Sequence, residues 1–178
     1  MDYNRGGHPH LDLLVANYLD TTLEKLPRPS SNPDCSWKGV PVSCGPRGLP
    51  FGSVQLFRNN GNGTFTDVSG ESGIGSARGG YPMTAAAADF DNDGWPDTYV
   101  ACDSRPTFLF RNHRDGTFRE EGLERAGMGV GAGDINLDGN ISSFKTNFAD
   151  DTNVLYANDG SGHFDDVTVR AGLAVETR

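Results

Sequence analysis

The sequence is short of lysine, glutamate, cysteine and long apolar stretches. Its 178 residues include three Lys, six Glu and three Cys, and 24 acidic residues against 15 basic ones give a formal net charge of −9. Affinity for a phosphate backbone comes mainly from clustered Lys and Arg, so this balance argues against a nucleic-acid partner. No apolar run approaches the roughly 18 residues of a membrane-spanning helix, which excludes a membrane span. The first residues also lack the regions of a secretory signal peptide.

Glycine, aspartate and asparagine are abundant instead. The chain has 24 Gly, 18 Asp and 13 Asn, while hydrophobic residues make up 35% of it. Asp and Asn favour tight turns and cation-binding loops, whereas Glu favours helices. The composition therefore predicts a thin core, many loops and little helix.

Two short motifs recur along the chain. An Asp-rich loop occupies residues 89–97 and 134–142, with a looser copy at residues 2–12. A second motif, Leu-Phe-Arg-Asn leading to Gly-Thr-Phe, occupies residues 56–65 and 109–118, with a variant at 155–164. The first Asp and the motif Asn are 23 residues apart in the middle unit (89 to 112) and 24 in the last (134 to 158). The first unit is longer by a Pro- and Cys-rich insertion at about residues 19–52.

These units predict an all-β fold. Each offers about four short apolar stretches joined by Gly-containing turns, which is typical of strands and hairpins. Repeats of 46 residues (112 to 158) and 53 residues (59 to 112) fit the blades of a propeller. We expect one domain over residues 1–178, a partial β-propeller of about three four-stranded blades at about 1–75, 76–126 and 127–178. A ring needs about four to eight blades, so it would stay open unless other copies or missing sequence complete it.

The middle loop has the chemistry of a calcium site. Positions 1, 3, 5 and 9 are Asp89, Asp91, Asp93 and Asp97, the carbonyl of Trp95 stands at position 7, and Gly at position 6 permits a sharp turn. Carboxylates about 4 Å apart repel by roughly 4 kcal/mol per pair at an effective dielectric of 20, so a cation is expected. Oxygen ligands without Cys or His favour Ca²⁺. An EF-hand is excluded because position 12 is not Glu.

The other two loops are weaker versions of this pattern. Asn replaces one acid and Ser142 replaces another in the third loop, and Gly6 stands in place of an acid in the first. We expect lower affinity at both, and an Asx-turn connection without metal is the alternative for all three. The candidate ligands are Asp134, Asn136, Asp138 and the carbonyl of Asn140 in the third loop, and Asp2, Asn4 and Asp12 in the first.

The motifs resemble the FG-GAP or VCBS repeats of integrin-alpha-like β-propellers. More narrowly, residues 44–50 (CGPRGLP) and 144–153 (FKTNFADDTN) are similar to the cartilage acidic protein-like branch, whose members often carry an ASPIC/UnbV segment. The resemblance implies a calcium-bound propeller, secreted or on the cell surface, that binds proteins or glycans. Carried over by position, it implies cation ligands at Asp89, Asp91, Asp93, Asp97, Asp134, Asn136 and Asp138.

Three cysteines remain to be placed. Cys35 and Cys44 lie nine residues apart in the insertion, and in an exported protein they would form a disulfide. Two free thiols or a metal site are the alternatives. Cys102 follows a predicted strand, and we expect it to be a buried free thiol.

The function expected from these features is a non-catalytic, calcium-binding extracellular module for adhesion, interaction or structural assembly. One alternative is a subunit of a self-assembling filament, joined through open blade edges. Another is a fragment of a propeller enzyme such as a polysaccharide lyase, for which Tyr81 or Arg105 could serve as the base. No G-x-S-x-G nucleophile motif is present.

Overall fold

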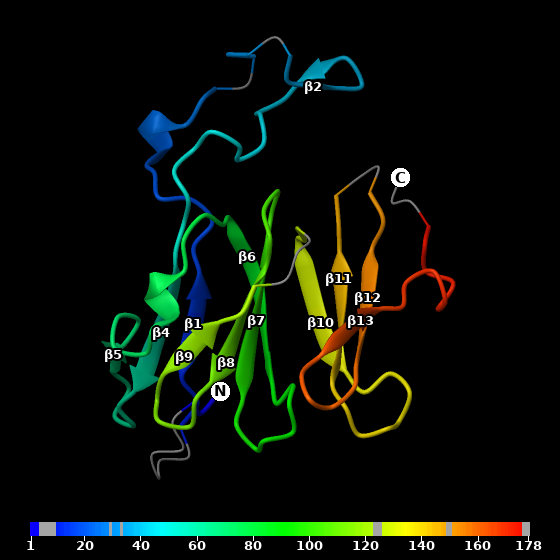
Figure 1. Cartoon of the computed structure of the whole chain (residues 1–178). Coiled ribbons are helices and arrows are strands. Elements are labelled where there is room, and N and C mark those ends of the chain that lie inside the picture. The colour runs from blue at the N-terminus through cyan, green and yellow to red at the C-terminus, as the bar shows by residue number, and fades with distance from the viewer. Residues whose placement is uncertain (4–9, 29, 33, 123–125, 149–150, 176–178) are drawn as a thin grey trace.

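The computed structural model describes the chain except for residues 4–9, 29, 33, 123–125, 149–150 and 176–178. Within the described part, the strands form three antiparallel sheets that stand side by side, and a separate two-stranded hairpin lies beyond one end of them (Figure 1). The fold is a partial, open β-propeller, and the helical elements of the described residues are two short 3-10 turns. The elements are β1 (Leu13–Ala16), η1 (Leu23–Lys25), β2 (Ser36–Trp37), β3 (Val40–Pro41), β4 (Val54–Asn59), β5 (Phe65–Asp67), η2 (Ile74–Ser76), β6 (Pro82–Ala88), β7 (Asp97–Cys102), β8 (Phe108–Asn112), β9 (Phe118–Glu120), β10 (Gly129–Gly133), β11 (Ser142–Thr146), β12 (Val154–Asn158) and β13 (Phe164–Asp166).

Each sheet is one blade. The second blade has the strand order β6-β7-β8-β9 and the third has β10-β11-β12-β13, so both contain the expected four strands. The first blade has the order β1-β4-β5 and contains three described strands, which corrects the expectation of four. In the second and third blades the innermost strands, β6 and β10, each precede an Asp-rich loop, and the described residues of the first unit include no counterpart of these strands.

The second motif builds the outer hairpin of every blade. In the first blade, the Thr64 backbone N–H and hydroxyl both donate to the Asn62 side-chain oxygen, at 3.0 and 2.6 Å. Thr117 makes the same pair of hydrogen bonds to Asp115 in the second blade, at 2.9 and 2.6 Å. Asn and Asp accept such bonds two residues along the chain and so stabilise tight turns. This is why each Asn/Asp-Gly-Thr sequence folds into a hairpin.

The core lies between the blades. Leu14, Ala16, Val54 and Leu56 of the first blade pack against the second blade, where Phe110 is fully buried. A second apolar cluster joins the other face of the second blade to the third blade. Its members are Phe90, Tyr99, Ala101 and Leu109, with Ala88, Val130, Ile141 and Phe164 packed against them. Because strand side chains alternate between faces, the central strands of the second blade, β7 and β8, contribute residues to both clusters.

The insertion carries the predicted disulfide. Cys35 and Cys44 are bonded to each other and enclose the β2–β3 hairpin, which confirms the pairing. The hairpin reaches the third blade, where the ring centroids of Trp37 and Phe148 are 6.4 Å apart. Among the described residues, no helix is long and apolar enough to cross a membrane.

Cys102 gives a direct measure of native packing. Its side chain is buried at the end of β7, and burial raises the pKa of the thiol to about 12. The thiolate is the reactive form, so we expect iodoacetamide at pH 8 to label Cys102 roughly 100-fold more slowly in the native protein than in the unfolded protein. Mass spectrometry of the chain with its disulfide intact would measure both rates. Rapid labelling in native buffer would contradict this packing.

Candidate metal centre

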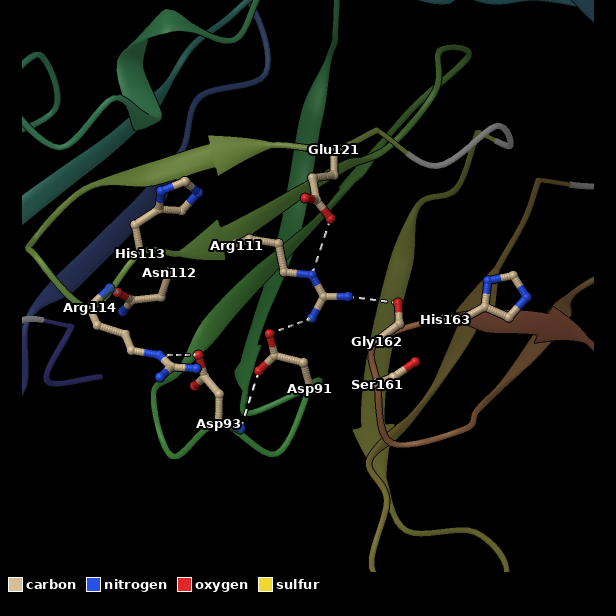
Figure 2. Close-up of a pocket in the computed structure, with 10 residues that line it drawn as sticks. All are labelled: Asp91, Asp93, Arg111, Asn112, His113, Arg114, Glu121, Ser161, Gly162 and His163. Atoms are coloured by element: carbon tan, nitrogen blue, oxygen red, sulfur yellow. Dashed lines mark hydrogen bonds and ion pairs between the residues drawn. The ribbon is translucent and has the colours of Figure 1, made fainter.

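A polar pocket of about 490 Å³ opens between the outer hairpin turns of the second and third blades (Figure 2). One wall carries Arg111 and Arg114, and the Asp-rich loop of the second blade contributes Asp91 and Asp93. The opposite wall belongs to the β12–β13 turn, which supplies Ser161, Gly162 and His163. The pocket therefore places arginines and carboxylates side by side.

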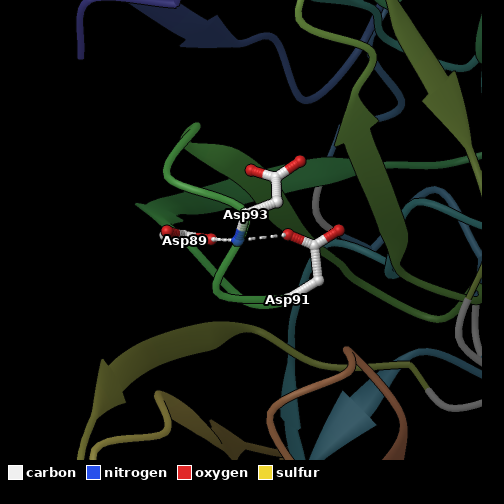
Figure 3. A group of neighbouring side chains, drawn as sticks. All are labelled: Asp89, Asp91 and Asp93. Carbon is white, nitrogen blue, oxygen red and sulfur yellow. Dashed lines mark hydrogen bonds between the residues drawn. The ribbon is translucent and has the colours of Figure 1, made fainter.

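Three of the predicted calcium ligands come together at this loop, between β6 and β7. Asp89, Asp91 and Asp93 each offer one carboxylate oxygen, and these three oxygens lie within 4.8 Å of one another (Figure 3). All three side chains are half-buried, so they are open to an ion from solvent. Burial raises the pKa of Asp91, and the nearby charge of Asp93 raises it further.

The backbone of the loop holds these carboxylates in place. The N–H groups of Asp93 and Gly94 donate to the two oxygens of Asp89, at 3.0 and 2.7 Å. The N–H of Trp95 donates to Asp93 Oδ1 at 2.7 Å. Gly94 has a φ of 88°, a left-handed conformation that glycine adopts without strain. The sharp turn expected at position 6 is therefore present.

Two arginines partly neutralise the cluster. Arg114 Nε lies 2.8 Å from Asp93 Oδ2, and Arg111 Nη1 lies 3.6 Å from Asp91 Oδ2. Arg114 is more than half exposed, so its contribution is screened by solvent. The cluster has three carboxylates and two guanidinium neighbours. One guanidinium is largely exposed, and the other also pairs with Asp97. The loop therefore keeps an excess of negative charge.

Asp97 stands apart from this cluster. Its carboxylate is buried, and Oδ1 accepts a hydrogen bond from the Asn112 N–H at 2.9 Å. Oδ2 accepts from the Phe90 N–H at 3.2 Å and from Arg111 Nη1 at 3.0 Å. Burial raises the pKa of Asp97 to about 6, although these donors oppose the rise. Asp97 thus ties the loop to strand β8, a role beyond the calcium-ligand role predicted for it.

Equivalent hydrogen bonds recur at the last residue of the other two loops, Asp12 and Ser142. Asp12 accepts from the Tyr3 N–H at 3.2 Å and from the Asn59 N–H at 2.9 Å. Ser142 Oγ accepts from the Asn158 N–H at 3.3 Å in the third blade. The sequence contained an indication of this contact. The first Asp of the loop and the Asn of the second motif are separated by nearly the same number of residues in the second and third units.

The third loop repeats the turn but contains fewer carboxylates. The N–H groups of Asp138 and Gly139 donate to Asp134 at 3.2 and 2.9 Å, as their equivalents do in the second blade. The Asn136 amide donates to Asp138 Oδ2 at 2.8 Å, and the Asn140 N–H donates to Asp138 Oδ1 at 2.8 Å. The turn therefore matches that of the middle loop, with two acids where the middle loop has three, and the cation-binding role of this loop stays a prediction.

The first loop is described only at its ends. Asp2 and Asp12 lie in the described part of the chain, whereas the predicted ligand Asn4 lies outside it. Asp12 occupies the anchoring position already noted. The cation-binding role of this loop stays a prediction.

The two residues considered for sugar chemistry do not meet at the pocket. Tyr81 is buried, and its hydroxyl donates to the Leu49 carbonyl at 3.1 Å. The Arg105 guanidinium lies over the Phe51 ring, 5.1 Å from its centroid. Neither residue lines the pocket beside the Asp-rich loop.

Comparison with known families identifies the type of repeat in this chain. The family model described as FG-GAP-like repeat matches residues 45–100 and again residues 89–141. Both matches contain the complete middle loop, and together they span residues 45–141, more than half of the 178-residue chain. No curated protein matches the chain. The narrower resemblance to the cartilage acidic protein-like branch stays a prediction. The chain belongs to the FG-GAP-like repeat family.

Proposed function

We propose that this chain is a calcium-stabilised, non-catalytic repeat module of an extracellular protein that serves adhesion or structural assembly. The observation that carries the proposal is the meeting of Asp89, Asp91 and Asp93, each half-buried and each with an oxygen within 4.8 Å of the others. Membership of the FG-GAP-like repeat family, which is typical of extracellular proteins, supports it. The Cys35–Cys44 disulfide also supports it, because such bonds persist in oxidising compartments.

Calcium suits this donor set better than other common ions. The cluster offers carboxylate oxygens on a loop without Cys or His, which is the hard-ligand chemistry of Ca²⁺. Magnesium requires a near-ideal octahedral shell and usually retains several waters. The half-buried position leaves room for water to complete a calcium shell, and the excess of negative charge favours a divalent ion.

The proposed ion acts as a structural staple. The loop joins β6 to β7, whose strands carry much of the core on both faces of the second blade. Carboxylates that repel one another in the free protein would become ligands of one ion, so binding would stabilise the folded state over the unfolded state. Asp97 anchors the other end of the loop through Asn112 and Arg111.

We place the partner-binding surface at the same loop edge. The pocket beside the cluster presents Arg111, Arg114, His113 and His163 together with acidic side chains. Such a mixed polar surface fits charged or hydroxyl-rich groups of protein or glycan partners.

A calcium titration tests the proposal. We expect isothermal titration calorimetry to show about one strong site per chain, with a Kd of roughly 10⁻⁴–10⁻³ M, the range of extracellular calcium modules. Asp91→Ala should weaken that site roughly tenfold or more, because it removes one of three charged ligands. Asp115→Ala changes an exposed aspartate outside the cluster and should leave affinity unchanged. Absence of binding, or equal affinity in Asp91→Ala, would refute the proposal.

A further inference from the structure

Arg114 occupies a position where the other two blades have glycine. The outer hairpin turns of the three blades align at Gly61, Arg114 and Gly160, each two residues after the motif Asn. In each turn the N–H of this residue donates to the side-chain oxygen of that Asn, at 2.9, 2.8 and 3.0 Å respectively. The three turns therefore share one local hydrogen bond, and the second blade differs in having a long charged side chain at this position.

The backbone of Arg114 has a conformation that glycine adopts more easily. Its φ is 66°, compared with 75° at Gly61 and 87° at Gly160, so all three residues are left-handed. A Cβ atom makes this conformation unfavourable, and glycine avoids that cost. An arginine held in such a conformation points to a role for its side chain.

The Arg114 side chain reaches back to the acidic cluster of its own blade (Figure 2). Its Nε donates to Asp93 Oδ2 at 2.8 Å, and Asp93 belongs to the Asp-rich loop between β6 and β7. The Asp93 side chain is 10% exposed, whereas that of Arg114 is 58% exposed. The guanidinium therefore neutralises a largely buried carboxylate while it remains accessible to water.

This contact engages a carboxylate that the proposed calcium site uses. Asp93 Oδ1 accepts the Trp95 N–H at 2.7 Å, and Oδ2 accepts the Arg114 guanidinium. A calcium ion held by Asp93 and its neighbours would compete with the guanidinium for the same carboxylate. A guanidinium that stayed beside the ion would also repel it, because both are positively charged.

The third blade shows a different solution at the same place. Its turn has Gly160, where a Cβ atom would lie 2.4 Å from Asn140 Oδ1 and would clash with it. Its loop has two acids, Asp134 and Asp138, and Asp138 Oδ2 accepts a hydrogen bond from the Asn136 amide at 2.8 Å. A cationic partner thus accompanies the loop with three carboxylates, and a neutral amide takes its place on the loop with two.

We propose that Arg114 is a tethered counter-ion of the acidic loop, which calcium displaces from Asp93 when it binds. This inference rests on the calcium site of the proposed function and concerns its regulation. Without calcium, the guanidinium offsets the repulsion among the three carboxylates. With calcium, the ion takes over that role and the guanidinium turns toward the pocket that it lines. Arg114 thereby lowers the affinity of the site and sets the calcium concentration at which it fills.

The calcium affinities of Arg114 variants test this role. In isothermal titration calorimetry, Arg114→Gln and Arg114→Gly should each bind calcium about fivefold more tightly than the unaltered chain, the upper range for the loss of an exposed ion pair. Arg114→Lys retains the charge and should bind with nearly the unaltered affinity. Arg47→Gln removes an exposed arginine of the insertion that does not line the pocket, and it should leave the affinity unchanged. The gain in Arg114→Gln should shrink in about 1 M salt, which screens exposed charges.

The Nε–H group of Arg114 reports the displacement itself. In excess chelator, its NMR signal should be protected from exchange with water by the hydrogen bond to Asp93. Saturating calcium should remove that protection. The Nε–H of Arg111 donates to Glu121 at 3.3 Å, outside the acidic cluster, and should keep the same exchange rate in both buffers.

The outcomes separate the role of Arg114 from the existence of the calcium site. If no variant binds calcium, the site itself is refuted and this proposal with it. If calcium binds but Arg114→Gln and Arg114→Gly show equal or weaker affinity, the counter-ion role is wrong and the site stands. Continued protection of the Arg114 Nε–H in saturating calcium would overturn the displacement in the same way.

Discussion

Replacing Asp97 with alanine is expected to lower the free energy of unfolding by about 3–5 kcal/mol, a cost typical of removing one partner of a buried ion pair. The Asp97 side chain is 1% exposed and accepts hydrogen bonds from Arg111 and two backbone N–H groups. Its loss leaves a largely buried guanidinium and two buried N–H groups without this acceptor. Urea unfolding followed by circular dichroism, with excess chelator present, measures the change.

The matched control is Ser142→Ala at the same position of the third loop. Ser142 accepts one backbone hydrogen bond and pairs with no charge, so its loss should cost about 1 kcal/mol. Chelator matters to the design, because Asp97 is also a predicted calcium ligand. If Asp97→Ala loses stability only when calcium is present, its role is to bind the ion and the anchoring interpretation is wrong.

Calcium should raise the melting temperature of the unaltered chain by about 5–10 °C. A ligand at 100 times its Kd stabilises the folded state by about 2.7 kcal/mol. For a chain of this length, each kcal/mol shifts the melting temperature by about 2–4 °C. Calorimetric scans with saturating calcium and with excess chelator provide the comparison.

The Asp91→Ala variant should lose most of that calcium response. In chelator it should melt at or slightly above the unaltered chain, because the raised pKa of Asp91 shows that its ionised form is unfavourable in the folded protein. A folded-state pKa above the unfolded value means that ionisation at neutral pH costs stability, and removing the group relieves that cost. A mere structural defect would instead lower the melting temperature in chelator.

Asp115→Ala serves as the control for the calcium response. Asp115 is exposed in the outer hairpin turn of the second blade and caps Thr117. Its variant should melt lower in both buffers by a similar amount, so the difference caused by calcium should remain. Equal melting of the unaltered chain with calcium and with chelator would refute the structural role of the ion.

Local pattern was sufficient for much of the fold and of the site. The repeated hairpins followed from Asn/Asp-Gly-Thr turns, which bond within themselves and need no distant partner. The grouping of Asp89, Asp91 and Asp93 also followed from spacing, because the turn that closes the loop lies between them. The disulfide needed one further assumption, an oxidising compartment.

Other features depended on contacts between distant segments. The role of Asp97 required knowing that Arg111 and Asn112 return beside it from the next strand, β8. The three Phe residues at 65, 118 and 164 occupy equivalent repeat positions, yet Phe65 is 47% exposed and Phe118 is 7% exposed. Phe118 is covered by Tyr3 of the preceding blade, and such a contact between blades does not follow from the repeat pattern.

The sequence by itself determined the repeated unit, its strands and the acidic loop, since each of these is built from residues close together along the chain. Only the tertiary structure decided which acid anchors the loop and which strand faces pack against a neighbouring blade. These properties depend on which blades are neighbours, and packing between blades joins residues as far apart as Tyr3 and Asn112.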